Sequence, residues 1–182
     1  MIRAIVLVAA VYTALIAQEF IPPLSFLGGA HLLLVPVLFC YGALWLSFPM
    51  MLAFALFTGL LSDLAFLQVI GDHVEIGLGW SVLYYVLAGT ALQPLRPLFQ
   101  EGRWEVHCLA SGAVTLLLLL SQYTMVCLRR GSFLFDGTIF WHMAGPAVFA
   151  LLIAPLVYFF FNLLPAGNPV RQTSRRGGSL VR

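Results

Sequence analysis

The sequence predicts an all-α integral membrane protein, a bundle of about six transmembrane helices in a single domain over residues 1–165. Of its 182 residues, 62% are hydrophobic and 9% are charged, and the mean hydropathy is +1.00. Soluble globular domains carry about 25% charged residues, so this class is excluded. The long uninterrupted apolar stretches indicate helices, because the strands of membrane β-barrels alternate apolar and polar residues over about ten positions.

The first helix is predicted over residues 2–20, where one Arg precedes an apolar stretch. A signal peptide has the same order of charge and apolar core, but Leu15 stands two residues before Ala17, which departs from the small-x-small cleavage pattern. Five further apolar stretches follow, so a retained membrane helix is the favoured interpretation. Pro22 and Pro23 end this helix, because proline cannot continue it.

The second helix is predicted to begin at residue 24 or residue 31 and to end at residue 46. Gly28, Gly29 and Pro36 interrupt its first half. Irregular backbone at membrane depth is tolerated only against protein or a water-filled cavity, so this half is expected to face one of the two. Whether the helix is continuous stays open.

The third helix, residues 48–66, carries the most informative face. Ala55, Gly59 and Asp63 recur every four residues, so two small residues and a carboxylate share one side of the helix. A carboxylate in hydrocarbon costs a few kcal/mol and is expected to face protein or water. Because Asp63 lies near the end of the helix, two interpretations stay open: a packing or functional role, or a side chain that reaches headgroup water.

A polar loop is predicted over residues 68–75, followed by the fourth helix over residues 76–95. Asp72, His73 and Glu75 lie in this loop. A solvated loop is favoured over a metal site, because three side chains in a flexible loop do not by themselves form a closed coordination shell.

Within the fourth helix, Tyr85, Gly89 and Gln93 share a face by the same four-residue spacing. This spacing predicts a helix contact that is close and partly polar, with ordinary packing between helices as the favoured interpretation. The last two helices are predicted over residues 106–128 and 139–164.

The distribution of Arg predicts the orientation. Six spans place both termini on one side, where seven of the nine basic residues collect: Arg3, Arg96, Arg103, Arg171, Arg175, Arg176 and Arg182. By the positive-inside rule both termini are cytoplasmic, and residues 166–182 are predicted to form a disordered basic cytoplasmic tail. The remaining pair, Arg129 and Arg130, leaves five spans as an alternative.

No enzyme, cofactor or metal signature is present, so neither catalytic nor cofactor-binding residues are predicted. Asp63, Asp72 and Asp136 are the candidates for the carboxylate pair of an intramembrane aspartic peptidase, but Asp63 alone falls in a predicted helix. The net charge of +2 gives no reason to expect nucleic acid as a partner. The three Cys are expected in the core, and three His at interfacial helix ends: Cys40, Cys108, Cys127, His31, His107 and His142.

The chain resembles the rod shape-determining MreD family. The resemblance is carried by GLLSDL at residues 59–64, GLG at residues 77–79, and Tyr85 with Gly89 inside the fourth helix, and it covers about residues 1–165. Two features depart from the family: Ala-His replaces the usual Pro-Asp before the leucines of the second helix, and the loop after the third helix is longer. Only Gly59 and Asp63 are therefore carried over from the family pattern.

The resemblance implies a non-catalytic scaffold of the cell-wall elongation complex in the bacterial inner membrane, involved in the maintenance of cell shape. Its partners would be MreC, the actin-like MreB, the glycosyltransferase RodA and its partner transpeptidase, together with membrane lipids. Six residues are the candidates for helix packing or partner binding: Ala55, Gly59, Asp63, Tyr85, Gly89 and Gln93.

The helix layout is also similar to that of the substrate-binding subunits of energy-coupling vitamin transporters, which makes a small-molecule transport subunit the alternative function. Such a protein needs a cavity in which several polar groups converge. The sequence offers few candidates: Asp63, Gln93, Ser111, Thr115 and Gln122. A third interpretation, an intramembrane enzyme, would require turnover that depends on Asp63.

Overall fold

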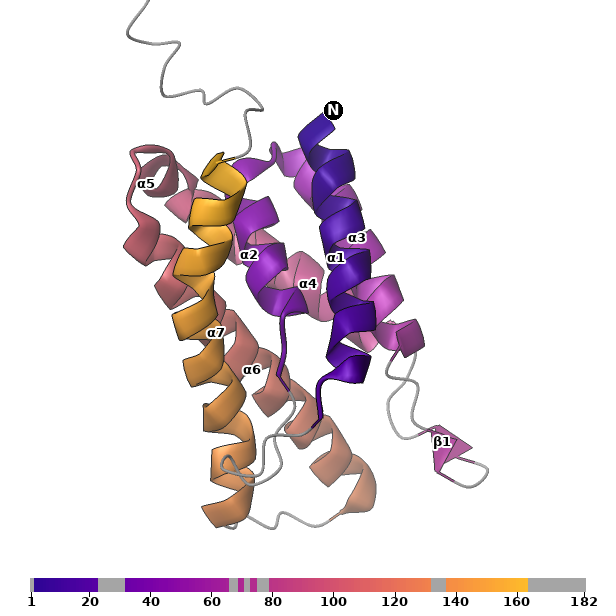
Figure 1. Ribbon diagram of the computed structural model, residues 1–182. Coiled ribbons are helices and arrows are strands. Elements are labelled where there is room, and N and C mark those ends of the chain that lie inside the picture. Colours follow the sequence, from indigo (N-terminus) through magenta and orange to yellow (C-terminus); the bar gives the residue numbers. More distant parts are fainter. Residues whose placement is uncertain are drawn as a thin grey trace, which may run out of the picture.

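The computed structural model describes residues 2–22, 32–65, 69–70, 73–74, 79–131 and 137–163. Apart from one pair of very short strands, the regular structure in these residues is helical, and the long helices lie beside one another (Figure 1). Six helices have 11 or more residues: α1 (Ile2–Phe20), α2 (Val35–Trp45), α3 (Phe48–Ala65), α4 (Trp80–Leu92), α6 (Trp104–Arg130) and α7 (Gly137–Leu163). The prediction of an all-helical fold is confirmed.

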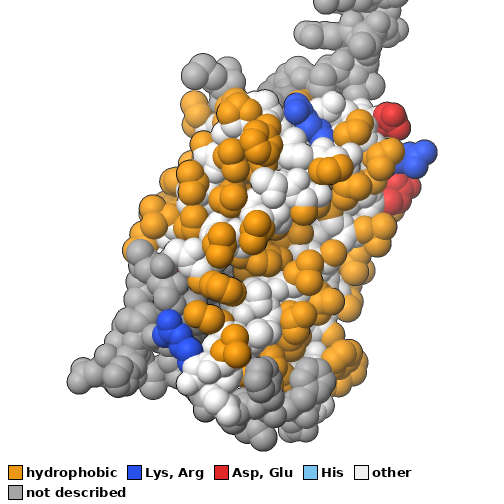
Figure 2. Space-filling model, turned by 180° about the vertical axis from the view of Figure 1, so that it is seen from behind, with side chains coloured by type: hydrophobic (Ala, Val, Ile, Leu, Met, Phe, Trp, Pro, Cys, Tyr) orange, Lys and Arg blue, Asp and Glu red, His pale blue; other side chains and the backbone are white. Residues whose placement is uncertain are grey.

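Among the residues that the structure describes, three helices are long and apolar enough to cross a membrane: Phe48–Ala65, Trp104–Arg129 and Ile139–Leu163. Charged side chains gather near the two ends of the face in Figure 2, and hydrophobic side chains cover the region between them. This distribution is typical of a membrane protein. The six crossings expected from the sequence stay a prediction, since α2 has only 11 residues and is about 16 Å long, half the thickness of the hydrocarbon core.

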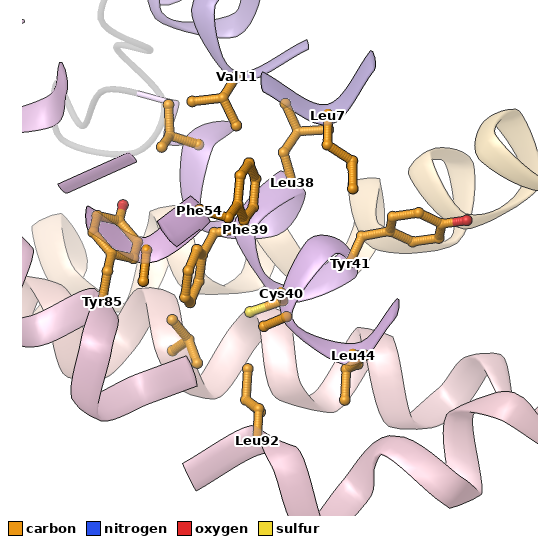
Figure 3. Close-up of a cluster of buried hydrophobic side chains, with 14 of the residues drawn as sticks. Leu7, Val11, Leu38, Phe39, Cys40, Tyr41, Leu44, Phe54, Tyr85 and Leu92 are labelled. Carbon is orange, nitrogen blue, oxygen red and sulfur yellow. The ribbon is translucent and has the colours of Figure 1, made fainter. Parts of the chain in front are cut away.

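Helix α2 forms the centre of the bundle. All ten residues from 35 to 44 are buried, and α2 contacts α1, α3, α4, α6 and α7. Its side chains meet Val11 of α1, Phe54 of α3 and Tyr85 of α4 in one hydrophobic core (Figure 3). A helix that is apolar on all sides is buried, and here the surrounding helices bury it.

Helix α2 begins at Val35, after the predicted start at residue 24 or 31. This late start agrees with the predicted interruption of the first half of the helix. Residues 32–34 are not helical, and Pro36 lies in the first turn of α2, where its missing N–H costs no hydrogen bond. Gly28 and Gly29 lie outside the described residues. Helix α7 continues through Pro146 and Pro155.

Two predicted loops contain regular structure. Strands β1 (Val69–Ile70) and β2 (His73–Val74) pair antiparallel within the predicted loop 68–75. The turn η2 (Gln93–Leu95) ends the predicted fourth helix, and α5 (Arg96–Gln100) lies between the helices predicted over residues 76–95 and 106–128. Proline in the first turn favours α5, and Gly102, at φ +90°, follows its end.

The three cysteines are buried free thiols, as predicted. The prediction of an interfacial His107 is wrong, because its side chain is fully buried between the rings of Tyr41 and Phe99. His142 is exposed near the start of α7. The predicted tail 166–182 and His31 lie outside the described residues.

Candidate functional site

The Asp63 carboxylate joins the end of α3 to the start of α4. Its two oxygens accept hydrogen bonds from the backbone N–H groups of Gly79, at 2.6 Å, and Ser81, at 3.1 Å. Gly79 is the N-cap of α4 and has no side chain with which to cap it. The first N–H groups of a helix have no partner within the helix, and a carboxylate there also interacts favourably with the helix dipole. Asp63 therefore caps α4 from a neighbouring helix.

Gly59, one turn before Asp63, lies where the backbones of α3 and α4 are in contact. A Cβ atom at Gly59 would be 2.4 Å from Cα of Val82 and 2.7 Å from its backbone N. Both atoms belong to the main chain of α4, so the space cannot be opened by a side-chain rotation. Small residues permit this kind of close approach between membrane helices.

Three of the other predicted site residues are buried, and Gln93 is half-buried. Ala55 is fully buried on α3, and Tyr85 is 1% exposed on α4. Gln93 donates a hydrogen bond from Nε2 to the carbonyl oxygen of Ala43 in α2, at 3.2 Å. Gly89 faces α2 and α3, and the residues that meet it are Met51 and Phe39.

Together, the six candidates place α4 against its neighbours within this chain. Asp63 is 7% exposed and both its oxygens are occupied. Among the described residues, the structure therefore gives these side chains an internal packing environment. A direct role in partner binding stays a prediction.

The substitution Gly89→Ala is expected to lower the free energy of unfolding by about 1 kcal/mol or less. A Cβ atom at Gly89 would be 2.4 Å from Sδ of Met51, but this atom belongs to a flexible side chain that adapts to irregular space. Unfolding of the purified protein in mixed micelles, followed by tryptophan fluorescence, measures the change. A loss above about 3 kcal/mol would show that Met51 cannot move aside.

A polar cluster on α6 was only partly predicted. His107, Ser111 and Thr115 are all fully buried, one turn apart. The Ser111 hydroxyl lies 3.4 Å from Nδ1 of His107, and the Thr115 hydroxyl donates to the Ser111 carbonyl oxygen at 2.7 Å. Nε2 of His107 has no hydrogen-bond partner among the described residues. The same four-residue spacing that drew attention to Asp63 could have indicated His107.

Several hollows lie on the described part of the chain, among them one of about 630 Å³ between α1, α2 and α7, and two others bear on the candidate functions. A pocket of about 350 Å³ lies beside the start of α2, and Gln122 alone of the five candidates for a small-molecule site lines it. An apolar groove of about 760 Å³ runs between α4 and α6, from Trp80 to Leu95 on one side and from Leu109 to Leu128 on the other.

Within the part of the chain that the structure describes, no three His, Cys, Asp or Glu side chains are grouped as metal ligands. The other candidate carboxylates, Asp72, Glu75 and Asp136, lie outside that part. No known family model matches the chain, and neither the curated proteins nor the solved structures contain a significant match.

Proposed function

We propose that this protein is a non-catalytic scaffold of the bacterial cell-wall elongation complex, embedded in the inner membrane and similar to the MreD family. Its partners are MreC, MreB, RodA and the partner transpeptidase of RodA, and its termini are cytoplasmic. The sequence motif that ends in Asp63 suggests the family, and the excess of Arg on the side of the termini supports the orientation.

The groove between α4 and α6 is the observation that carries this proposal. The wall formed by α4 and η2 is about 23 Å long, and the α6 wall is about 29 Å long, close to the thickness of the hydrocarbon core. Several small residues line it: Ala88, Ala91, Ala110 and Ala113. Membrane helices associate where small residues let backbones approach, so the groove suits a single membrane helix of a partner such as MreC.

The hydroxyl groups in the groove already have hydrogen-bond partners, whereas Nε1 of Trp80, which also lines the groove, is buried without a partner among the described residues. The hydroxyl of Tyr84 donates to the carbonyl oxygen of Val114, which links α4 to α6 at 2.5 Å. Ser121 and Thr124 donate to carbonyl oxygens of α6 itself. An apolar helix can therefore lie in the groove without leaving these hydroxyls unpaired.

We expect Ala91→Leu and Ala113→Leu to lower the recovery of MreC with this protein about tenfold. Both alanines are exposed in the groove, and a larger side chain would hold a docked helix away. A tenfold loss corresponds to about 1.4 kcal/mol. The measurement is affinity purification of the full chain from bacterial membranes, with partners quantified by mass spectrometry.

Ala53→Leu is the matched control, because Ala53 is an exposed alanine on α3 that does not line the groove. Equal recovery of MreC with all three variants would rule out the groove as the docking surface. If the unaltered protein recovers neither MreC nor RodA, the scaffold function itself is wrong.

A further inference from the structure

The pocket lies beside the start of α2, where Leu33, Val35 and Pro36 line it. Five helices contribute to its wall, among them the start of α2, the end of α3 and the start of α4. A span of full length would extend α2 into this end of the bundle, whereas α2 begins at Val35. The pocket volume of about 350 Å³ lies at the lower end of the range for small-molecule sites.

One wall of the pocket carries buried hydroxyl groups. Ser62 and Ser81 are 5% exposed and Tyr85 is 1% exposed, and all three line the pocket. Ser62 donates to the carbonyl oxygen of Thr58 at 2.8 Å, and its hydroxyl also lies within hydrogen-bond reach of the Tyr85 hydroxyl. A hydroxyl group has one donor and two acceptor sites, which makes this wall suited to hydroxyl or amide groups.

The opposite wall, from α6 and α7, mixes three polar side chains with apolar ones. Gln122, Tyr123 and His142 lie there beside Leu118, Val126 and Met143. A bound molecule would therefore meet polar groups on one side and both kinds on the other. This arrangement favours an amphiphile over a purely apolar chain.

The described lining contains no Asp, Glu, Lys or Arg. Asp63 is close in sequence to Ser62, but it does not line the pocket, and its two oxygens accept hydrogen bonds from N–H groups of α4. Burying a charged group without a partner of opposite charge is costly. An uncharged ligand therefore suits the described part of the lining.

We propose that this pocket binds an uncharged amphiphile that carries hydroxyl groups, such as the glycerol head of a neutral lipid or a free polyol. The site is separate from the groove between α4 and α6 and does not depend on the scaffold function. Its ligand is held by the hydroxyls of α3 and α4 and by the amide of Gln122.

The experiment uses the full chain in lipid nanodiscs and a monoacylglycerol that carries a photoreactive diazirine. We expect labelling of peptides from residues 118–126 and 139–143, which line the pocket. The variants Gln122→Leu and Val126→Trp, which respectively remove an amide and fill the space, should each lower labelling about fivefold or more. Unlabelled monoacylglycerol and free glycerol are the two competitors.

Ser121→Ala is the matched control, because Ser121 is the neighbour of Gln122 but lines the groove instead. Competition by monoacylglycerol alone identifies a lipid as the ligand, and competition by free glycerol identifies a soluble polyol. If Val126→Trp does not fold, Gln122→Leu decides the result. Undiminished labelling of the folded variants, or equal labelling by a phosphate-bearing probe of the same chain length, would overturn the proposal.

Discussion

Replacing Gly59 by alanine is expected to lower the free energy of unfolding by about 2 to 3 kcal/mol. The new Cβ atom would lie 2.4 Å from Cα of Val82, so α3 and α4 must move apart. That movement would also stretch the bonds from Asp63 to the start of α4. Unfolding in mixed micelles measures this loss. The substitution Gly59→Leu should lower the free energy of unfolding by more than Gly59→Ala does.

Gly137→Ala provides the control for the effect of a methyl group in a helix. A Cβ atom at Gly137 would meet nothing within 4 Å, and alanine is the better helix former. This variant is expected to be neutral or slightly stabilised. If Gly59→Ala and Gly137→Ala unfold alike, the close contact between α3 and α4 does not contribute to stability.

The same Gly59 contact should matter for assembly. Gly59→Leu is expected to reduce the recovery of partners more than Asp63→Asn does, because a bulky side chain separates the two backbones. The walls of the groove include α4, so a displaced α4 would change the groove as well. Equal partner recovery with Gly59→Leu and the unaltered chain would contradict this expectation.

The sequence was sufficient for four of the long helices, α1, α3, α6 and α7, and for one packed face, whereas α4 is shorter than the predicted helix 76–95 and α5 was not predicted. The observed limits of α1 and α3 agree with the predicted limits to within one residue, and α6 and α7 each begin two residues earlier. The four-residue repeat of Ala55, Gly59 and Asp63 placed these residues on a common face because the helix period is fixed. The helix limits and the shared face both follow from the order of apolar, small and polar residues within one helix.

The partners of that face were not predictable from pattern. The bond from Asp63 to Gly79 joins residues 16 positions apart, and nothing in the helical period specifies such a pairing.

The central place of α2 was missed for a related reason. A helix buried in protein and a helix exposed to lipid are both apolar on all sides, so composition does not distinguish them. His107 was assigned to the interface because it lies near a helix end, whereas α5 and α2 supply the rings that cover it.

Replacing Asp63 by alanine is the second substitution with a large expected effect. It should lower the free energy of unfolding by about 2 to 4 kcal/mol. The change leaves two N–H groups without acceptors, that of Ser81, which is buried, and that of Gly79, which is half-buried. A fully buried N–H group without an acceptor costs about 1 to 3 kcal/mol, and a half-buried one costs less. The favourable interaction of the carboxylate with the α4 dipole is lost as well. Unfolding in mixed micelles gives the total.

Amide hydrogen exchange would locate the loss at the start of α4. Faster exchange is expected for residues 79–84 and not for α6, since the cap lies on α4 alone. Asp63→Asn should cost about half as much, because its one carbonyl oxygen can accept from one N–H group while its amide donors face the other. The control is Glu101→Ala, which removes an exposed carboxylate after α5 and should stay within about 0.5 kcal/mol of the unaltered chain. Unchanged exchange over residues 79–84 in Asp63→Ala would mean that the carboxylate does not cap α4, and the end of α3 would then be free to present it elsewhere.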